Sequence, residues 1–302
     1  MSEIQDLVII GAGPAGMTAA IYASRAQMKF EFLERSFAGG QITNTYEIEN
    51  YPGIKMASGF ELTTMFREHV EHFGVEIKAE DVMSVELEGP IKKVVTAERT
   101  IETKTIIFAM GATSKKIGVK GEDEFVGRGV SNCATCDGAF YRNRVTMVVG
   151  GGDVAVEDAI YLARMCKKVY LVHRRDELRA VKVLQEKLFA TENIEMVWNS
   201  GLVEIQGDQF VNKVVVKNFL TDELKDVEVD GVFIAIGSDP STKFLQGKVD
   251  MDKGGYIATS ENCMTSVEGV FAAGDLRQKS LRQVITACGD GATAVFGAEH
   301  YI

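Results

Sequence analysis

The feature that most constrains the fold of this chain is a glycine-rich turn between a short apolar run and a helix-like segment. Residues 6–10 (Asp-Leu-Val-Ile-Ile) lead into Gly11-Ala-Gly-Pro-Ala-Gly16, and the small residues of 17–26 follow. In such a strand–turn–helix unit, the glycines permit the turn, let the backbone approach a pyrophosphate, and let the helix pack close to the strand. The helix N-terminus then offers N–H groups to phosphates. The residues assigned to this loop are Gly11, Gly13, Pro14, Ala15 and Gly16.

The same pattern recurs 139 residues later. Residues 145–149 form the apolar run, Gly150-Gly-Gly-Asp-Val-Ala155 the turn, and residues 156–165 the helix. Alanine is an accepted residue at the third position of the turn. Two complete copies in one chain predict an α/β fold with two Rossmann-like nucleotide-binding domains.

The two copies differ at the position that contacts the ribose of a bound nucleotide. A second strand is predicted at residues 30–34, and this run ends, eighteen residues after Gly16, in Glu34, whose carboxylate can hydrogen-bond a ribose 2′-hydroxyl. Eighteen residues after Ala155 the second copy has His173, followed by Arg174, Arg175 and Arg179. Guanidinium groups bind a phosphate with charge-assisted hydrogen bonds, whereas a carboxylate would repel it. The second site is therefore predicted to take NADP(H), and the first an unphosphorylated ribose.

Opposite chemistry at the two ribose positions indicates two different cofactors. One copy would be typical of a simple dehydrogenase, and the usual partner of a nicotinamide dinucleotide is FAD. The basic segment 164–187, with eight Lys or Arg and three Asp or Glu, would by itself also fit a solvated helix face. Its register with the second glycine turn favours a phosphate site. We expect FAD at the first site and NADPH at the second.

A cysteine pair, Cys133-Ala-Thr-Cys136, lies between the two glycine turns. Structural zinc needs four ligands, and no second pair of cysteines and no nearby His-x-x-x-His accompanies this one, so a metal site is disfavoured. In a reducing compartment such a pair is typical of a dithiol/disulfide couple. Asp137 follows directly and could exchange a proton with a thiol, although Asp137-Gly138 is equally typical of a plain turn.

The composition excludes several classes of protein. A net charge of −10 disfavours non-specific nucleic-acid binding, and no run approaches the roughly 18 apolar residues of a membrane span. The N-terminus lacks the basic and apolar segments of a signal peptide, and five cysteines do not form a disulfide framework. We expect a cytoplasmic protein in which Cys166, Cys263 and Cys288 serve packing.

Three further strand-like runs predict how the domains are arranged along the chain. Each ends in a glycine turn, at Gly111, Gly237 and Gly274. Because the third run resembles the first, residues 1–113 and 244–302 are expected to build one discontinuous FAD-binding domain. Residues 117–240 are expected to form an inserted NADPH-binding domain that carries the cysteine pair.

Together these motifs resemble those of the low-molecular-weight bacterial thioredoxin reductases over essentially the whole chain. The Cys-Ala-Thr-Cys-Asp segment just before a nucleotide fingerprint is the most specific match. The matching segments are Gly11–Gly16, Glu49–Gly53, Cys133–Asp137, Gly150–Ala155, His173–Arg179, Phe271–Asp275 and Arg282-Gln283. The resemblance implies a homodimeric, NADPH-dependent thioredoxin-disulfide reductase.

The resemblance also implies roles for individual residues. Cys136 would face the flavin, Cys133 would attack the disulfide of thioredoxin, and Asp137 would be the acid/base. Asp275 would bond the ribityl chain of FAD, with Gln41, Asn50, Arg282 and Gln283 around the isoalloxazine ring. Further expected FAD contacts are Arg35, Gly40, Val82, Gly111, Gly274 and Val284. Further expected NADPH contacts are Gly150, Gly152, Asp153, Val154, Ala155, Ile236 and Gly237.

Four other functions fit parts of the pattern. A ferredoxin-linked reductase of the same fold would not need the arginines after His173, and a ferredoxin–NADP reductase would lack the cysteine pair. A reductase serving a peroxiredoxin or a glutaredoxin-like acceptor would use the same two cofactors. A non-catalytic redox sensor would not need a dithiol beside an FAD site.

The order of the motifs also predicts a motion. The cysteine pair and the NADPH site lie in the same inserted domain, yet both must reach one flavin ring. They cannot easily occupy its face together, so the inserted domain is expected to rotate between reduction and reoxidation.

Overall fold

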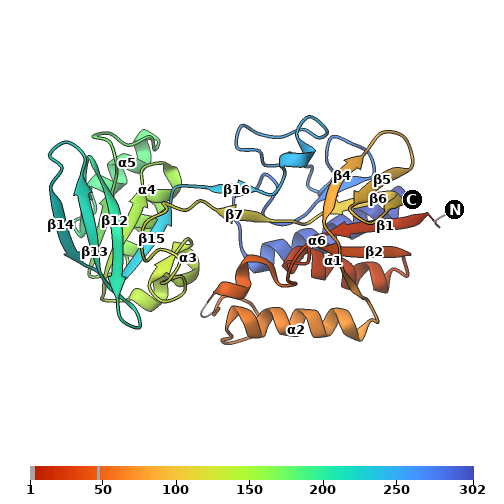
Figure 1. Ribbon diagram of the computed structural model, residues 1–302, viewed down its shortest axis with the longest axis horizontal. Helices are drawn as coiled ribbons and strands as arrows, with labels where there is room; N and C mark the ends of the chain where they lie inside the picture. The colour runs from red at the N-terminus through yellow and green to blue at the C-terminus, as the bar shows by residue number, and fades with distance from the viewer. Residues whose placement is uncertain (1–3, 46–47) are drawn as a thin grey trace. The chain divides into compact units, whose positions relative to one another are not determined.

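The computed structural model describes residues 4–45 and 48–302. The chain divides into two compact units (Figure 1). Unit 1 comprises residues up to Thr45, Glu49–Thr113 and Asp239–Ile302, and unit 2 consists mainly of residues 114–238. The chain returns to unit 1 at Asp239.

A seven-stranded, mostly parallel sheet forms the centre of unit 1. Its order is β3-β2-β1-β6-β5-β4, and β17 also pairs with β6. The strands are β1 (Gln5–Ile10), β2 (Phe30–Glu34), β3 (Ile77–Ala79), β4 (Val82–Glu86), β5 (Lys92–Thr96), β6 (Thr100–Phe108) and β17 (Val270–Ala272). β1 is central and buried from Leu7 to Ile10, as expected of a strand covered on both faces. The edge at which β1, β2, β6 and β17 end is therefore one common edge of the sheet.

Helices α1 (Pro14–Arg25), α2 (Gly59–His72) and α6 (Val284–Tyr301) lie on one face of this sheet (Figure 1). The core on that face joins Leu7 and Ile9 to the alanines of α1 and α6. α1 and α6 approach closely because α6 has Gly291 at the contact, where a Cβ would lie 2.2 Å from the carbonyl oxygen of Ala15. Small residues on both helices thus allow the N-terminus of α1 to lie next to α6. Two short 3₁₀ helices, Gly40–Asn44 and Lys243–Leu245, complete the unit.

Unit 2 is built on a five-stranded parallel sheet of order β11-β10-β9-β15-β8. Its strands are β8 (Val130–Ser131), β9 (Val145–Gly150), β10 (Lys168–Val172), β11 (Ile194–Val197) and β15 (Gly231–Ala235). Its helices are α3 (Ala134–Asp137), α4 (Asp153–Ala163) and α5 (Lys182–Phe189), with a 3₁₀ helix at Gly138–Tyr141. An antiparallel sheet of β12 (Ser200–Gly207), β13 (Val211–Asn218) and β14 (Leu224–Glu228) packs on it through the apolar cluster around Val214.

The two segments that connect the units pair with each other. β7 (Ala112–Ser114) and β16 (Ser238–Pro240) form a two-stranded sheet (Figure 1). The N–H of Lys115 donates to the carbonyl of Gly237 at 3.0 Å, and that of Ser241 donates to the carbonyl of Gly111 at 3.0 Å.

Two parallel sheets with flanking helices confirm the predicted α/β class. The strands predicted at 6–10, 30–34 and 145–149 are β1, β2 and β9. The helices predicted after the two glycine turns begin earlier than expected, at Pro14 and Asp153, inside the glycine motifs themselves.

Candidate active site

The first glycine loop joins β1 to α1. Gly11 has φ +103°, and a Cβ there would lie 2.6 Å from the carbonyl oxygen of Ala109, so only glycine fits. Gly16 packs against the carbonyl oxygen of Gly11, which a Cβ would meet at 1.8 Å. Gly13 caps α1 without a side-chain hydrogen bond, and Pro14 is the first helical residue. The N–H groups of the first helical turn therefore remain available to a phosphate.

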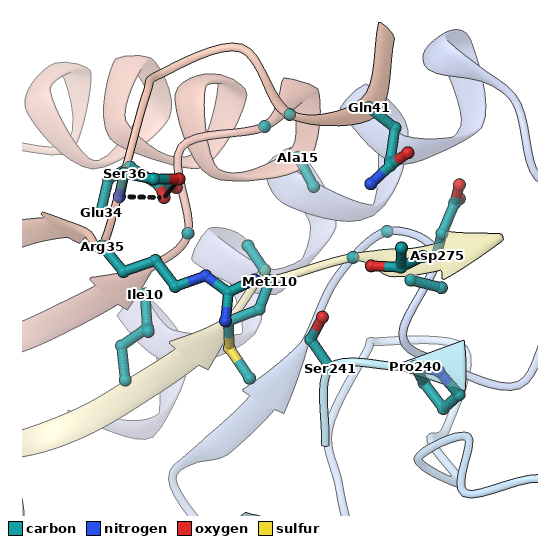
Figure 2. Close-up of a pocket in the computed structure, with 18 of the residues that line it drawn as sticks. Ile10, Ala15, Glu34, Arg35, Ser36, Gln41, Met110, Pro240, Ser241 and Asp275 are labelled. Carbon is teal, nitrogen blue, oxygen red and sulfur yellow. Dashed lines mark hydrogen bonds between the residues drawn. The ribbon is translucent and has the colours of Figure 1, made fainter. Parts of the chain in front are cut away.

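A cavity of about 920 Å³ opens beside this loop in unit 1. Figure 2 shows Glu34 and Arg35 on one side of the cavity and Gln41 and Asp275 on the other. The volume lies at the upper end of the range for small-molecule sites. Fourteen of the residues expected to contact FAD line it: Gly11, Gly13, Pro14, Ala15, Glu34, Arg35, Gly40, Gln41, Val82, Gly111, Gly274, Asp275, Gln283 and Val284.

The other three expected FAD contacts, Gly16, Asn50 and Arg282, lie outside the cavity lining. Asn50 reaches it indirectly, because its Nδ2 donates to Oε1 of Gln283 at 3.0 Å. The guanidinium of Arg282 lies 4.2 Å from the centre of the Tyr256 ring, and its Nε donates to the carbonyl of Asp275 at 3.4 Å. These two side chains support lining residues rather than forming the wall.

Glu34 is held at the end of β2 by the loops around it. Its Oε2 accepts the N–H of Ala12 at 2.7 Å, and its Oε1 accepts the N–H of Ser36 at 2.9 Å (Figure 2). The carboxylate is thus fixed on the cavity wall and retains acceptor capacity for a ribose hydroxyl.

The hydrogen bonding of the Asp275 carboxylate indicates whether this cavity fits FAD. Its Oδ1 is buried and has no hydrogen-bond partner within residues 4–45 and 48–302. Burial raises the pKa of its carboxyl, with the charges of Lys279 and Arg282 acting in the opposite direction. A buried acceptor without a donor is costly, so the site is complete only when a bound group supplies one. The sugar hydroxyls of a dinucleotide are such donors.

The predicted cysteine couple is present as a disulfide. Cys133 and Cys136 are bonded, with their Cα atoms 5.3 Å apart. Cys133 caps α3, since its Sγ accepts the N–H of Cys136 at 3.2 Å. Ser131 at the end of β8 positions the pair, because its Oγ accepts the N–H of Cys133 at 3.0 Å. A hydrogen bond to sulfur also favours the thiolate that reduction would create.

Asp137 ends the same short helix and is half-buried. Burial raises the pKa of its carboxyl above the ordinary 3.8, although a hydrogen bond with Ser131 opposes this. A carboxyl with a raised pKa is better able to carry a proton at the pH of the cell. Neither this environment nor the role of Ser131 is readable from the sequence.

The second glycine loop joins β9 to α4. Gly150 lies against the carbonyl oxygen of Ala235, which a Cβ would approach to 2.4 Å. Gly151 lies against the ring of His173, because a Cβ on Gly151 would lie only 2.2 Å from Cε1 and Nδ1 of that ring. The ring nitrogen Nε2 of His173 is buried with no partner among the described residues, and burial lowers the pKa of the ring. The histidine thus packs against the loop and leaves the arginines after it in solvent.

The remaining residues expected to contact NADPH gather at the carboxyl edge of the unit 2 sheet. The N–H of Arg179 donates to the carbonyl of Gly151 at 2.7 Å, and Asp153 Oδ1 accepts the N–H of Val181 at 2.8 Å. These bonds tie the basic segment to the glycine loop. Gly152, Val154 and Ala155 belong to the β9–α4 turn, Arg174, Arg175 and Arg179 are exposed, and Ile236 and Gly237 follow β15, which pairs with β9. Ligands of open α/β sheets bind at this edge.

Comparisons with known proteins identify the family of this chain. A profile of the pyridine nucleotide-disulphide oxidoreductase family matches residues 5–291. The chain is 46% identical to a thioredoxin reductase of Peptoclostridium acidaminophilum over 309 residues, which cover 100% of the chain and 98% of that protein. The chain belongs to the thioredoxin reductase family.

Solved thioredoxin reductases share its fold. The crystal structure of the enzyme from Streptococcus pyogenes MGAS5005 is 46% identical, covers 100% of this chain and 99% of its own, and has a TM-score of 0.96. A second crystal structure, of the Lactococcus lactis thioredoxin reductase in the "FR conformation", is also 46% identical and covers 98% of each chain, with a TM-score of 0.66.

As a thioredoxin reductase, the chain is a flavoprotein oxidoreductase that uses FAD and NADPH. This favours the NADPH-dependent reading over a ferredoxin-linked one. None of the helices within the described residues combines the length and apolar character that a membrane span requires.

Proposed function

We propose that this enzyme passes electrons from NADPH, through FAD and the Cys133–Cys136 disulfide, to the disulfide of thioredoxin. The observation that carries the proposal is the disulfide in α3 beside Asp137, in a chain similar over its whole length to thioredoxin reductases. Bound FAD would supply the two-electron redox chemistry that links NADPH to the disulfide. Gly11, Gly13, Glu34, Gln41 and Asp275 are proposed to hold it in unit 1, and His173 with the following arginines to hold NADPH in unit 2.

The chemistry of the protein's own residues lies in the cysteine pair. Two electrons and two protons convert the disulfide into two thiols. The Cys133 thiolate then attacks the thioredoxin disulfide, forms a mixed disulfide and expels one thioredoxin thiolate, which Asp137 protonates. Cys136 next attacks Sγ of Cys133, which restores the internal disulfide and releases thioredoxin with both sulfurs reduced. The sum is NADPH, a proton and a disulfide converted into NADP⁺ and a dithiol.

Replacing Asp137 with asparagine is expected to slow thioredoxin reduction about 100-fold, because general acid–base catalysis contributes roughly that factor or more. NADPH-dependent bleaching of the flavin should keep its wild-type rate, since Asp137 lies at the dithiol. Stopped-flow absorbance separates the two half-reactions. A variant that reduces thioredoxin at the wild-type rate would remove Asp137 from the mechanism.

The same substitution is expected to stabilise the oxidised protein near neutral pH. Because burial raises the folded-state pKa of Asp137 above 3.8, the wild type loses stability as the pH rises through that pKa. Below the unfolded-state pKa of Asp137, the carboxyl is protonated in both the folded and the unfolded protein, so none of this stability is lost there. The Asn variant should therefore unfold at a higher temperature than wild type at pH 8, and the difference should shrink towards pH 4. Calorimetry over this range would show the opposite trend if the pKa were lowered instead.

We further propose that residues 1–113 and 244–302 form the FAD-binding domain, that residues 117–240 form the NADPH-binding domain, and that the latter rotates during turnover. The two solved relatives support the rotation, since they are equally identical to this chain but have TM-scores of 0.96 and 0.66. Such a difference is expected of a two-unit protein with more than one arrangement of its units. Crosslinks that lock one geometry should block turnover; full activity in a locked enzyme would contradict the motion.

The enzyme is also proposed to be a cytoplasmic homodimer, as the resemblance to its family implies. Light scattering of the purified holoenzyme measures the oligomeric state directly. A mass of one chain, 33.0 kDa, at micromolar concentration would contradict it.

The acceptor is tested by following NADPH consumption with purified oxidised proteins. Thioredoxin should be reduced with a higher kcat/KM than a glutaredoxin-like protein or a peroxiredoxin. Anaerobic NADPH alone should bleach the flavin, whereas reduced ferredoxin should not be required. Preferential reduction of one of the other acceptors would redirect the proposal to that partner.

A further inference from the structure

A cluster of buried charges adjoins the wall of the unit 1 cavity without lining it. Asp290 lies in the second turn of α6, and its carboxylate accepts from Arg277 Nη1 at 2.7 Å and from Lys279 Nζ at 2.7 Å. The three side chains are 13%, 13% and 10% exposed, in the order Asp290, Arg277, Lys279. The chemistry of the dithiol uses none of them.

The cluster is joined to the cavity by one further hydrogen bond. Oδ2 of Asp290 also accepts the backbone N–H of Gly274 at 3.0 Å. Gly274 lines the cavity, has φ +86°, and packs against Ala15, whose Cβ would lie 3.1 Å from a Cβ at Gly274. The next residue is Asp275, the carboxylate whose Oδ1 is buried without a partner in the described part of the chain. The Asp290 carboxylate therefore binds the backbone N–H of the residue directly before the one that carries the orphaned acceptor.

The cluster is itself held rigidly. Nε of Arg277 donates to Oγ1 of Thr259 at 2.8 Å, and the carbonyl of Asp290 accepts from Sγ of Cys263 at 3.6 Å. An ion pair that served stability alone would need no bond into the loop. Here the bond goes to a glycine in the left-handed region, a residue type with wide backbone freedom, and it adds to the bond that the Gly274 carbonyl accepts from the N–H of Arg277.

We propose that Asp290 is a positioning residue of the flavin site: it fixes the Gly274 peptide and thereby directs the Asp275 carboxylate into the cavity. The role rests on the proposed function, because it requires that Asp275 bind a hydroxyl of FAD. Groups that orient a ligand-binding side chain commonly affect affinity through that side chain. Arg277 and Lys279 compensate the Asp290 charge and keep it in place.

The test is a double-mutant cycle on FAD release from the purified holoenzyme, measured by flavin fluorescence on dilution. Asp290→Asn keeps the shape of the side chain and is expected to raise the FAD dissociation constant about tenfold, within the range of coupling for residues in one network. Asp275→Asn should raise it at least as much. The double variant should bind FAD no more weakly than Asp275→Asn alone, because Asp290 acts through Asp275.

Glu122→Gln is the matched control. Like Asp290, Glu122 is a buried acid that holds backbone N–H groups, but it lies in unit 2. The residue is 4% exposed, and its carboxylate accepts from the N–H groups of Ile117 and Gly118 at 3.0 and 2.6 Å. Its loss should lower the denaturant midpoint measured by circular dichroism and leave FAD affinity within about twofold of wild type. If the Asp290→Asn variant does not fold, the variant that combines Asp290→Asn with Lys279→Met takes its place in the cycle. This variant removes both charges of the Asp290–Lys279 ion pair together.

The outcomes distinguish the positioning role of Asp290 from the role of Asp275 as an FAD ligand. FAD affinity unchanged by Asp290→Asn, or effects of Asp290 and Asp275 that simply multiply, would overturn the positioning role while Asp275 remains a ligand. An Asp275→Asn enzyme that binds FAD as tightly as wild type would overturn the assignment of Asp275, and with it the role of Asp290.

Discussion

Replacing Cys133 with serine is expected to reduce NADPH-dependent thioredoxin reduction by about 10⁴-fold or more, as removal of a nucleophile typically does. The variant can form neither the internal disulfide nor the mixed disulfide through Sγ of residue 133. Flavin reduction by NADPH does not use this sulfur, so anaerobic bleaching should proceed normally. The two rates are measured on one preparation by stopped-flow absorbance.

Cys166→Ser is the control for this substitution. Cys166 is buried and is not disulfide-bonded, and burial raises the pKa of its thiol, so it is a packing residue. Its serine variant should retain thioredoxin reduction. Activity that survives in Cys133→Ser would contradict the dithiol mechanism, and loss of flavin bleaching would show that the variant damages more than the disulfide.

Replacing both Arg174 and Arg175 with alanine is expected to raise the KM for NADPH about 100-fold, because each charge-assisted hydrogen bond to a phosphate contributes about 1.5–3 kcal/mol. Both side chains are exposed and directly follow His173, whose ring packs against Gly151 of the β9–α4 loop. NADH lacks that phosphate, so its KM should change little. Steady-state kinetics with both nucleotides give the ratio.

Arg164→Ala removes one positive charge elsewhere in unit 2 and is the control for an effect of charge alone. Arg164 is the exposed C-cap of α4, at the end of the helix away from the glycine loop. It should leave discrimination between NADPH and NADH unchanged. If it reduced the preference as much as the double variant does, the effect would reflect net charge rather than a phosphate site.

The sequence predicted the two nucleotide folds well because their signals are local. β2 lies at Phe30–Glu34, where the apolar run ends in the carboxylate, and β9 starts at the predicted Val145. Glycine turns between strand and helix leave the backbone little choice. The expected packing role of Cys166, Cys263 and Cys288 also agrees with their burial.

What the sequence could not predict depends on contacts between distant segments. The antiparallel sheet β12–β14 was not anticipated. Asp290 was missed because its partners are defined only when α6 packs beside the end of β17. The raised pKa of Asp137 likewise arises from burial, which no motif encodes.

The pairing of β7 with β16 makes the inserted unit separable. Because the chain leaves and re-enters unit 1 through neighbouring strands, the ends of unit 2 lie together, as do the ends that its removal would create in unit 1. Insertion of a folded module at such a point requires no rearrangement of its host. A chain built this way is expected to tolerate replacement of the inserted unit while unit 1 keeps its fold.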